Sequence, residues 1–326
     1  MRLVVHIGLH KTGTTSLQLM LAQNRELLRA HRVLYPEAAA VEAGGHLNLV
    51  WQATGSWKYQ PDAGGIDELV AEARQHRPEV LLISAESLSG YAKNPAPLAI
   101  VEHISQALGS KPEIVCTIRP QHIMLDSLYA QNASTGYTTQ RFEHYSIEVL
   151  NRGTLDFETL LGRWFDRFGH VTLIPVDCST SLETRFLAAT GLDHLPPLSS
   201  VGTANRRPSA RVVEYCRVAT EILNRMKVRP LRRRAILAGI RADVEAKYPT
   251  DRPFSGLTPE FVRLLREHFR PSNLRFRKQR LAGAKLFTAS DPDNTFRTHI
   301  VDFNSISADE RLYFLEIFSV ALDQHR

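Results

Sequence analysis

The stretch RLVVHIGLHKTGTTSLQ, residues 2–18, decides the fold class. It joins an apolar run to a loop that contains Gly8 and Gly13, and the loop leads into a helical pattern. A short apolar run predicts a buried β-strand, and a strand followed by a helix is typical of a parallel α/β sheet. Backbone N–H groups and a helix N-terminus converge on an anion in this geometry. The sequence therefore predicts an anion-binding loop after the first strand.

The residue types in this loop suit an anionic ligand. Gly8 lets the strand turn, and Gly13 lets the backbone approach the ligand closely. Lys11 adds a positive charge, and His10 beside it is a second candidate contact for phosphate. The first helical turn offers three further hydroxyl donors, on Thr14, Thr15 and Ser16.

The loop differs in two ways from one that binds a nucleoside triphosphate with magnesium. Gly8 to Gly13 matches the spacing GxxxxG, but Thr14 takes the place of the lysine that follows the second glycine. The later run EVLLISAES, residues 79–87, has no aspartate at its end to complete a magnesium site. These differences disfavour metal-assisted nucleotide hydrolysis.

Apolar runs alternate with helical patterns over the first two thirds of the chain. The runs at 79–84, 113–118 and 171–176 predict further parallel strands. The patterns between the strands, among them 15–31, predict covering helices, and after Pro196 the patterns are helical. We expect one domain over residues 1–326, with a P-loop-like α/β core at about 1–195 and a mainly helical portion at about 200–326.

The composition limits the class of protein without identifying it. A net charge of +6 permits an anionic ligand but does not require one. Cys116, Cys178 and Cys216 have no metal-ligand spacing, and we expect reduced, mostly buried thiols. The first apolar run has no cleavage-site pattern after it, and no apolar run approaches the ~20 residues of a membrane span. We therefore expect a soluble, cytoplasmic protein.

A second motif lies in EIVCTIRPQHIMLDSLYAQ, residues 113–131. Arg119 ends an apolar run, Pro120 suits the start of a helix, and Ser127 follows Arg119 by eight residues. The planar guanidinium group of an arginine can bind two phosphate oxygens at once, and a serine adds a short neutral donor. Taken alone, an arginine at the end of a strand is more typical of a surface ion pair, and Ser127 of an ordinary helix residue.

Together, the two motifs resemble those of sulfotransferases that use 3′-phosphoadenosine-5′-phosphosulfate (PAPS), particularly a bacterial branch that begins HIGxHKTGTTS. The resemblance covers roughly residues 4–135. It implies that the loop binds the 5′-phosphosulfate, that Arg119 and Ser127 bind the 3′-phosphate, and that no metal is needed. PAPS is then a co-substrate and adenosine-3′,5′-bisphosphate (PAP) a product. The donor-binding residues implied in this way are His10, Lys11, Thr12, Gly13, Thr14, Thr15, Ser16, Arg119, Ser127 and Arg206.

The assignment of Arg206 rests on the segment VGTANRRPSARVVEY, residues 201–215. This segment is similar to the one at which related bacterial proteins return to the donor, so Arg206 and Arg207 could close over its phosphates. The eukaryotic cytosolic enzymes have a glycine-rich RKG-type segment there, which this chain lacks. A basic cap before the helix that begins near Pro208 is the alternative.

The resemblance also implies which residues catalyse sulfonate transfer. The acceptor must lose a proton and the leaving phosphate must be stabilised, and Lys11 is the expected electrophile on the leaving side. Family members place a His or Glu after the strand that precedes the arginine-bearing strand, and Glu86 has this position. His46, in AGGHLNLVW, is the alternative base because imidazole titrates near neutral pH. We expect His6, inside the first strand, to be a buried structural residue.

The expected acceptor is a hydroxyl group on a small molecule or glycan, with a carbohydrate or glycolipid favoured. Trp51, Trp57 and Tyr59 could stack on a sugar. The basic run at 227–234 could meet an acidic glycan or an anionic membrane surface, or form a solvated helix face. Two other classes compete: a P-loop-like small-molecule kinase that uses Mg-ATP, and a nucleic-acid-binding module. The sequence has no aromatic-interleaved basic motif that would favour nucleic acid as a partner.

Overall fold

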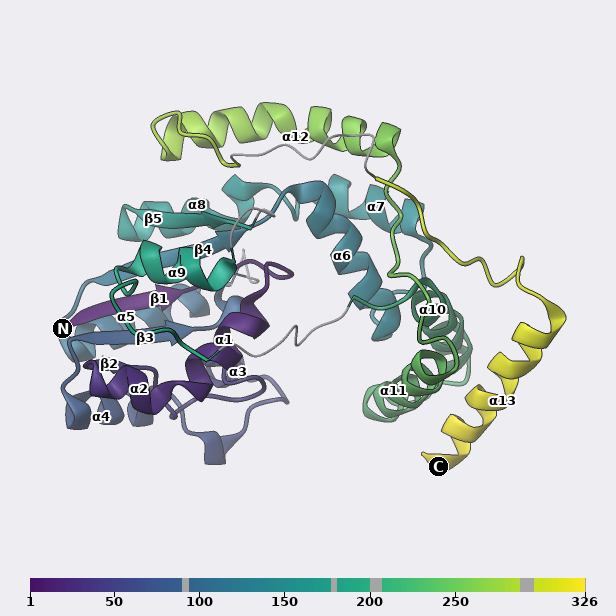
Figure 1. Cartoon of the computed structure of the whole chain (residues 1–326), viewed down its shortest axis with the longest axis horizontal. Coiled ribbons are helices and arrows are strands. Elements are labelled where there is room, and N and C mark those ends of the chain that lie inside the picture. Colours follow the sequence, from purple (N-terminus) through teal and green to yellow (C-terminus); the bar gives the residue numbers. More distant parts are fainter. Residues whose placement is uncertain (90–93, 177–180, 200–206, 288–295, 326) are drawn as a thin grey trace. The chain divides into compact units, whose positions relative to one another are not determined.

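The structure, a computed structural model, describes residues 1–89, 94–176, 181–199, 207–287 and 296–325 (Figure 1). The chain divides into two compact units, each built from segments that are far apart in the sequence. The first unit comprises Met1–Pro120, Asp156–Asn205 and Arg270–Ser290, and the second comprises Gln121–Leu155, Arg206–Phe269 and Asp291–Arg326. Helix α12 (Pro259–Arg280) contributes residues to both units.

The first unit contains a five-stranded parallel sheet in the order β2-β3-β1-β4-β5. Its strands are β1 (Arg2–His6), β2 (Val33–Leu34), β3 (Val80–Ser84), β4 (Pro112–Ile118) and β5 (Val171–Pro175). β1 is central, with His6 opposite Ser84 of β3 and Val115 of β4. The prediction of a parallel α/β sheet flanked by helices is confirmed.

Helices of the first unit cover this sheet. They are α1 (Thr14–Gln23), α2 (Arg25–Ala30), α3 (Leu47–Ala53), α4 (Ile66–His76), α5 (Ala96–Leu108), α8 (Phe157–Phe168) and α9 (Leu182–Thr190), with the short helices η1 (Pro61–Ala63) and η2 (Glu86–Leu88). Successive side chains of a strand point to opposite faces. Val4 and Leu82 pack against Leu17 of α1 and Phe186 of α9 in one cluster. The alternate residue Val5 is equally buried, so both faces of the sheet are covered.

The segment after the loop differs from the prediction of one helix over 15–31. It is divided into α1 and α2 at Asn24. The Asn24 amide donates to the carbonyl groups of Met20 at 2.7 Å and Ser199 at 3.0 Å, and its oxygen accepts the N–H of Ser199 at 3.0 Å. An asparagine side chain that bonds to the backbone in this way competes with helix continuation. Val33 and Leu34, which follow α2, form the short strand β2, which the sequence patterns did not predict.

The second unit is helical where the structure describes it. It contains α6 (Gln121–Ser134), α7 (Phe142–Asn151), α10 (Ala210–Arg225), α11 (Pro230–Lys247), α13 (Ala308–Gln324) and the first part of α12. Tyr215 and Leu223 of α10 share a buried cluster with Ile240 of α11 and with Phe314 and Phe318 of α13. The helical patterns after Pro196 therefore correspond to observed helices.

The structure describes two of the three cysteines. Cys116 and Cys216 are buried free thiols, and burial raises the pKa of each. Cys178 lies outside the described residues. Within the parts of the chain that the structure describes, no helix is both long and apolar enough to cross a membrane.

Candidate functional site

The carboxyl ends of β1, β3 and β4 meet at one edge of the sheet, because these strands are adjacent and parallel. The strand order reverses around β1, since the chain runs to β2 on one side and later to β4 and β5 on the other. Ligands of open α/β sheets bind at such a point. The loop from Gly8 to Gly13 follows β1, Glu86 follows β3 and Arg119 follows β4. The structure thus brings together three segments that the sequence singled out separately.

The loop after β1 has a backbone suited to an anion. Lys11 and Gly13 have positive φ angles, 66° and 85°, and α1 begins at Thr14. Gly13 occupies the position before the helix, and as a glycine it offers no side chain to cap the first N–H groups of α1. The loop is accessible because Gly13 is exposed and Thr15 is half-buried. The positive end of the α1 dipole and the charge of Lys11 therefore both favour a negative ligand here.

Two of the predicted loop contacts are turned into the protein. The buried Thr12 hydroxyl donates to the carbonyl of Leu9 at 2.5 Å and lies 2.7 Å from the Thr117 hydroxyl. Thr14 is also buried, and a Cβ atom on Gly8 would lie 2.6 Å from its methyl carbon. The Thr12 hydroxyl therefore stabilises the loop, and half-buried Thr15 and Ser16 are the more accessible hydroxyl donors.

His10, Lys11 and Glu86 interact electrostatically. The His10 residue is exposed to solvent. The protein atoms around its ring nevertheless desolvate the imidazole and lower its pKa. The charge of Glu86 raises that pKa and the charge of Lys11 lowers it further. Both charges therefore act on the same imidazole.

Glu86 begins the short helix η2 and is half-buried. Its Oε2 atom accepts a hydrogen bond of 2.9 Å from the side-chain amide of Gln18 on α1. The Ser89 hydroxyl donates to the carbonyl of Glu86 and to that of Gly8, each at 2.9 Å. These bonds tie the segment that carries Glu86 to both the loop and α1.

His46, the alternative base, is completely buried (0% exposed). Its Nδ1 atom accepts the backbone N–H of Ser84 at 3.1 Å, and its Nε2 atom lies 3.1 Å from the carbonyl of Pro36. The ring packs edge-on against Tyr35, and burial lowers its pKa to about 4. Both ring nitrogens bond to groups inside the protein, so neither is available to take a proton from a bound acceptor. This geometry disfavours His46 as the base.

The second motif is divided between the two units. Arg119 is half-buried directly after β4 in the first unit, and Ser127 is half-buried on α6 in the second. Arg206 lies outside the described residues. Arg207 forms an ion pair with buried Asp126, which also accepts the N–H of Gly256 at 2.8 Å. Arg207 therefore has a structural partner in its own unit.

The candidate acceptor contacts differ in accessibility. Trp51 is buried, whereas Trp57 is 66% exposed, and the Lys58 ammonium group lies 5.6 Å and 5.9 Å from their ring centroids. Within the basic run, Arg232 bonds to the carbonyl of Leu322 and Arg233 to Asn224. Trp57 is thus an accessible aromatic surface, while two arginines of the run hold helices of the second unit together.

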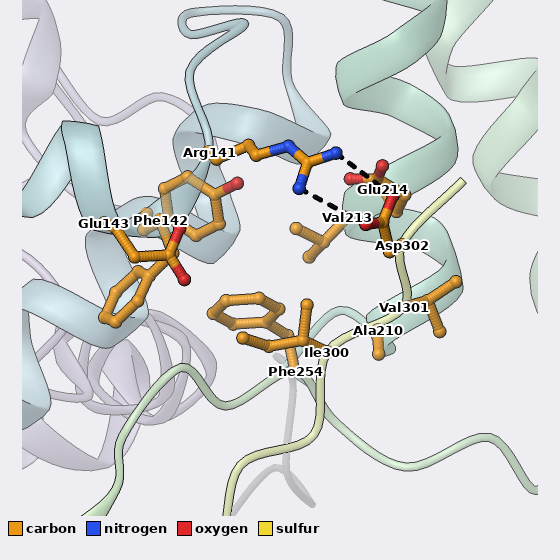
Figure 2. A pocket seen from close by; sticks show the side chains of 11 residues that line it. Arg141, Phe142, Glu143, Ala210, Val213, Glu214, Phe254, Ile300, Val301 and Asp302 are labelled. Atoms are coloured by element: carbon orange, nitrogen blue, oxygen red, sulfur yellow. Dashed lines mark hydrogen bonds and ion pairs between the residues drawn. The ribbon is translucent and has the colours of Figure 1, made fainter. Parts of the chain in front are cut away.

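Sequence reasoning missed a pocket in the second unit, with a volume of about 240 Å³ (Figure 2). The buried rings of Tyr129, Phe142 and Phe254 form its apolar side. Arg141 lies on its polar side and forms a bidentate ion pair with Asp302, at 3.1 Å and 3.2 Å. The pocket is assembled from several segments between Tyr129 and Asp302 that are far apart in the sequence, so no local pattern marks it.

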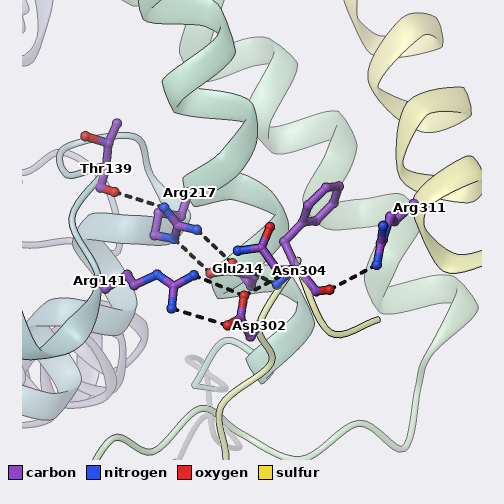
Figure 3. Close-up of polar contacts among 8 residues, drawn as sticks. Thr139, Arg141, Glu214, Arg217, Asp302, Asn304 and Arg311 are labelled. Atoms are coloured by element: carbon purple, nitrogen blue, oxygen red, sulfur yellow. Dashed lines mark hydrogen bonds and ion pairs between the residues drawn. The ribbon is translucent and has the colours of Figure 1, made fainter. Parts of the chain in front are cut away.

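A second ion pair, between Arg217 and the pocket-lining residue Glu214, lies beside that of Arg141 and Asp302 (Figure 3). Arg217 binds both carboxylate oxygens of Glu214, at 2.7 Å and 2.8 Å, and donates to the carbonyl of Thr139 at 3.0 Å. Glu214 also accepts the N–H of Phe303 at 3.1 Å. These bonds connect α10 to the segments at Thr139 and Phe303 within the second unit.

Comparisons of this chain with protein-family models, with curated proteins and with solved structures gave no match. Among the described residues, no group of three or more His, Cys, Asp or Glu side chains is arranged to hold a metal ion. The candidate site is therefore the edge of the sheet where Lys11, Glu86 and Arg119 follow adjacent strands.

Proposed function

We propose that the protein is a P-loop-like sulfotransferase that moves a sulfonate group from PAPS to a hydroxyl acceptor. The observation that carries this proposal is the convergence of the loop, Glu86 and Arg119 at one edge of the sheet, after β1, β3 and β4. A donor with phosphate at both ends needs two separate anion-binding positions, and a base must stand near its reactive end. The three segments supply these three elements in one place.

The residues at this edge fit such a donor. The 5′-phosphosulfate is assigned to the uncapped N-terminus of α1, with contacts from Lys11, the backbone at Gly13 and the hydroxyls of Thr15 and Ser16. The 3′-phosphate is assigned to Arg119, and Ser127 is its proposed companion on the basis of the spacing in the sequence. A nucleoside triphosphate has its phosphates in one row and no 3′-phosphate, so it needs no phosphate-binding position for the 3′ end of the nucleotide.

Each catalytic role follows from charge and accessibility. The donor supplies an activated sulfonate, whose transfer leaves negative charge on a phosphate oxygen. Lys11 is assigned to stabilise that charge, because its ammonium group is the cation of the loop. Glu86 is assigned to accept the proton of the acceptor hydroxyl, because it is half-buried at the same edge and is held by Gln18. Buried His46 is then a structural residue that holds Ser84 and Pro36.

The proposed acceptor is a carbohydrate or glycolipid. Trp57 supports this class, since an exposed indole ring offers a flat apolar face that can stack on a sugar. Tyr59 follows it by two residues and is half-buried. Because Arg232 and Arg233 bond within their own unit, they give less support to a separate role in acceptor binding.

The proposal is tested by incubating the protein with donor that carries radiolabelled sulfonate and a panel of hydroxyl acceptors, without magnesium. We expect label to move to a carbohydrate acceptor, and we expect Lys11→Met and Glu86→Gln to abolish the transfer. A control variant, Lys111→Met, removes an exposed lysine that precedes β4, at the opposite end of this strand from Arg119, and should retain the transfer. Consumption of ATP that requires magnesium, with no sulfonate transfer, would instead favour the small-molecule kinase.

A further inference from the structure

A chain of buried hydrogen bonds runs beneath the candidate site. It begins at the Gln18 amide, which lies 2.9 Å from Glu86 and 3.2 Å from the Ser84 hydroxyl. From Ser84 it continues to Nδ1 of His6 at 2.8 Å, and from Nε2 of His6 to the Thr117 hydroxyl at 3.2 Å. Ser84, His6 and Thr117 belong to the adjacent strands β3, β1 and β4. This series of hydrogen bonds therefore crosses the sheet at its carboxyl edge.

This series of hydrogen bonds ends in the anion-binding loop. The Thr117 hydroxyl lies 2.7 Å from that of Thr12, which donates to the carbonyl of Leu9 at 2.5 Å. Leu9 and Thr12 flank His10 and Lys11 in the sequence. The loop and Glu86 are thus joined by an uninterrupted series of side-chain hydrogen bonds as well as by the backbone.

The Thr12 end fixes the direction of the bonds in this chain. Thr12 uses its hydrogen for the carbonyl of Leu9, so the Thr117 hydroxyl donates to Thr12 and accepts from Nε2 of His6. A neutral imidazole that donates from Nε2 accepts at Nδ1, so the Ser84 hydroxyl donates to Nδ1 and accepts from the Gln18 amide. Burial lowers the pKa of His6 to about 3, which keeps the ring in this neutral form.

The backbone at two glycines packs closely against the side chains that form these hydrogen bonds. A Cβ atom on Gly45 would lie 2.7 Å to 2.8 Å from the amide atoms of Gln18. A Cβ atom on Gly8 would lie 2.6 Å from the Thr117 hydroxyl and 2.8 Å from Nε2 of His6. The backbone at both glycines therefore covers the polar chain closely and leaves its side chains little room to turn. Gln18 itself is only 2% exposed.

From this geometry we infer that Gln18 is a positioning residue: it orients the Glu86 carboxylate and, through Ser84, His6, Thr117 and Thr12, fixes that carboxylate relative to the anion-binding loop. Gln18 has no assigned contact with donor or acceptor, because it is buried and uses its amide hydrogens on Ser84 and Glu86. Its role in turnover rests on the proposed function. Its effect on Glu86 does not depend on the proposed function, because the orientation of Glu86 is a property of the protein without ligand.

The inference is tested in Gln18→Met, which keeps the length of the side chain and removes the amide. His10 serves as the reporter, since the charge of Glu86 acts on its ring. Its titration is followed by NMR and assigned with His10→Gln. Gly45→Ala disturbs the same amide from the other side and provides a second variant. Thr54→Val is the control, because the Thr54 hydroxyl bonds to the carbonyl of Val50 in its own helix.

We expect the pKa of His10 to shift by about half a unit or more in Gln18→Met and in Gly45→Ala, and to stay unchanged in Thr54→Val. PAP affinity should change by less than about threefold in Gln18→Met, because the donor does not touch this side chain. A His10 titration in Gln18→Met identical to that of the wild type would overturn the inference. Failure of the wild type to bind PAP would reject the proposed function, while the His10 titration would still decide the role of Gln18.

Discussion

The Nδ1 atom of His46 accepts the backbone N–H of Ser84 at 3.1 Å, and this bond exists only while the imidazole is neutral. Burial lowers the pKa of His46 to about 4 and that of His6 to about 3. The unfolded chain, with histidine pKa values near 6.5, then binds more protons than the folded chain below that pH. The free energy of unfolding of the first unit should therefore fall as the pH drops from about 6.5 towards 4, by up to about 1.4 kcal/mol per pH unit for each histidine.

Urea unfolding at pH 7.5 and pH 5.5 measures this effect. Tryptophan fluorescence is a suitable signal, because Trp51, Trp57 and Trp164 all belong to the first unit. His46→Gln, which cannot titrate, should lose about 1 kcal/mol less than the wild type between the two pH values. Equal losses in the two proteins would show that His46 is not held neutral by the fold.

The two glycines of the loop should respond differently to alanine. At Gly8 a methyl group would meet Thr117 and Thr14 at 2.6 Å, so Gly8→Ala should destabilise the first unit by about 2 kcal/mol. Gly13 is exposed with a φ of 85°, and Gly13→Ala should cost about 1 kcal/mol while weakening PAP binding, because alanine disfavours that conformation. Urea unfolding and calorimetry on both variants check this, and an unaltered stability of Gly8→Ala would contradict the close packing there.

Ser127 is predicted to recognise the 3′-phosphate. Ser127→Ala should bind PAP about tenfold more weakly than the wild type, because a hydrogen bond to a charged group is lost. Affinity for adenosine 5′-monophosphate, which lacks that phosphate, should be unchanged. Calorimetric titration with both nucleotides distinguishes the effects, and an equal loss for the two ligands would assign Ser127 a structural role.

The buried carboxylate of Asp126 should stabilise the second unit through Arg207 and the N–H of Gly256. Asp126→Ala leaves both donors without this acceptor, and we expect a loss of about 3 kcal/mol. Asp126→Asn keeps an acceptor for Gly256 and should lose less. Hydrogen exchange of peptides from α6 and α10 reports the stability of this unit. Equal exchange in Asp126→Ala and the wild type would show that Asp126 does not stabilise it.

The sequence predicted those parts of the structure that local patterns encode. The apolar runs marked β1, β3, β4 and β5, and their order along the chain placed the loop and Arg119 after parallel strands. Strand β2, with two residues, is too short to produce a pattern, and the helix break at Asn24 depends on Ser199, far along the chain. Local sequence therefore predicts elements better than the contacts between them.

The polar side chains of the site show the same limit. No local pattern marks Gln18, because its partners Ser84 and Glu86 lie more than sixty positions away. His46 suggested a base by residue type, whereas the structure buries it and bonds both ring nitrogens. Register between β1 and β3, which places His6 opposite Ser84, is what builds the hydrogen-bond chain. One signal was available: a histidine inside an apolar strand implies a buried polar partner.

Calorimetric titration with PAP in the absence of metal tests the central claim most directly, with ADP and ATP plus magnesium as competitors and Arg119→Ala as the variant. The sulfotransferase proposal predicts tight, metal-free binding of PAP that weakens about tenfold or more in Arg119→Ala, since a charged phosphate contact is removed. Preference for ATP with magnesium, or PAP binding that is indifferent to the loss of Arg119, would contradict it.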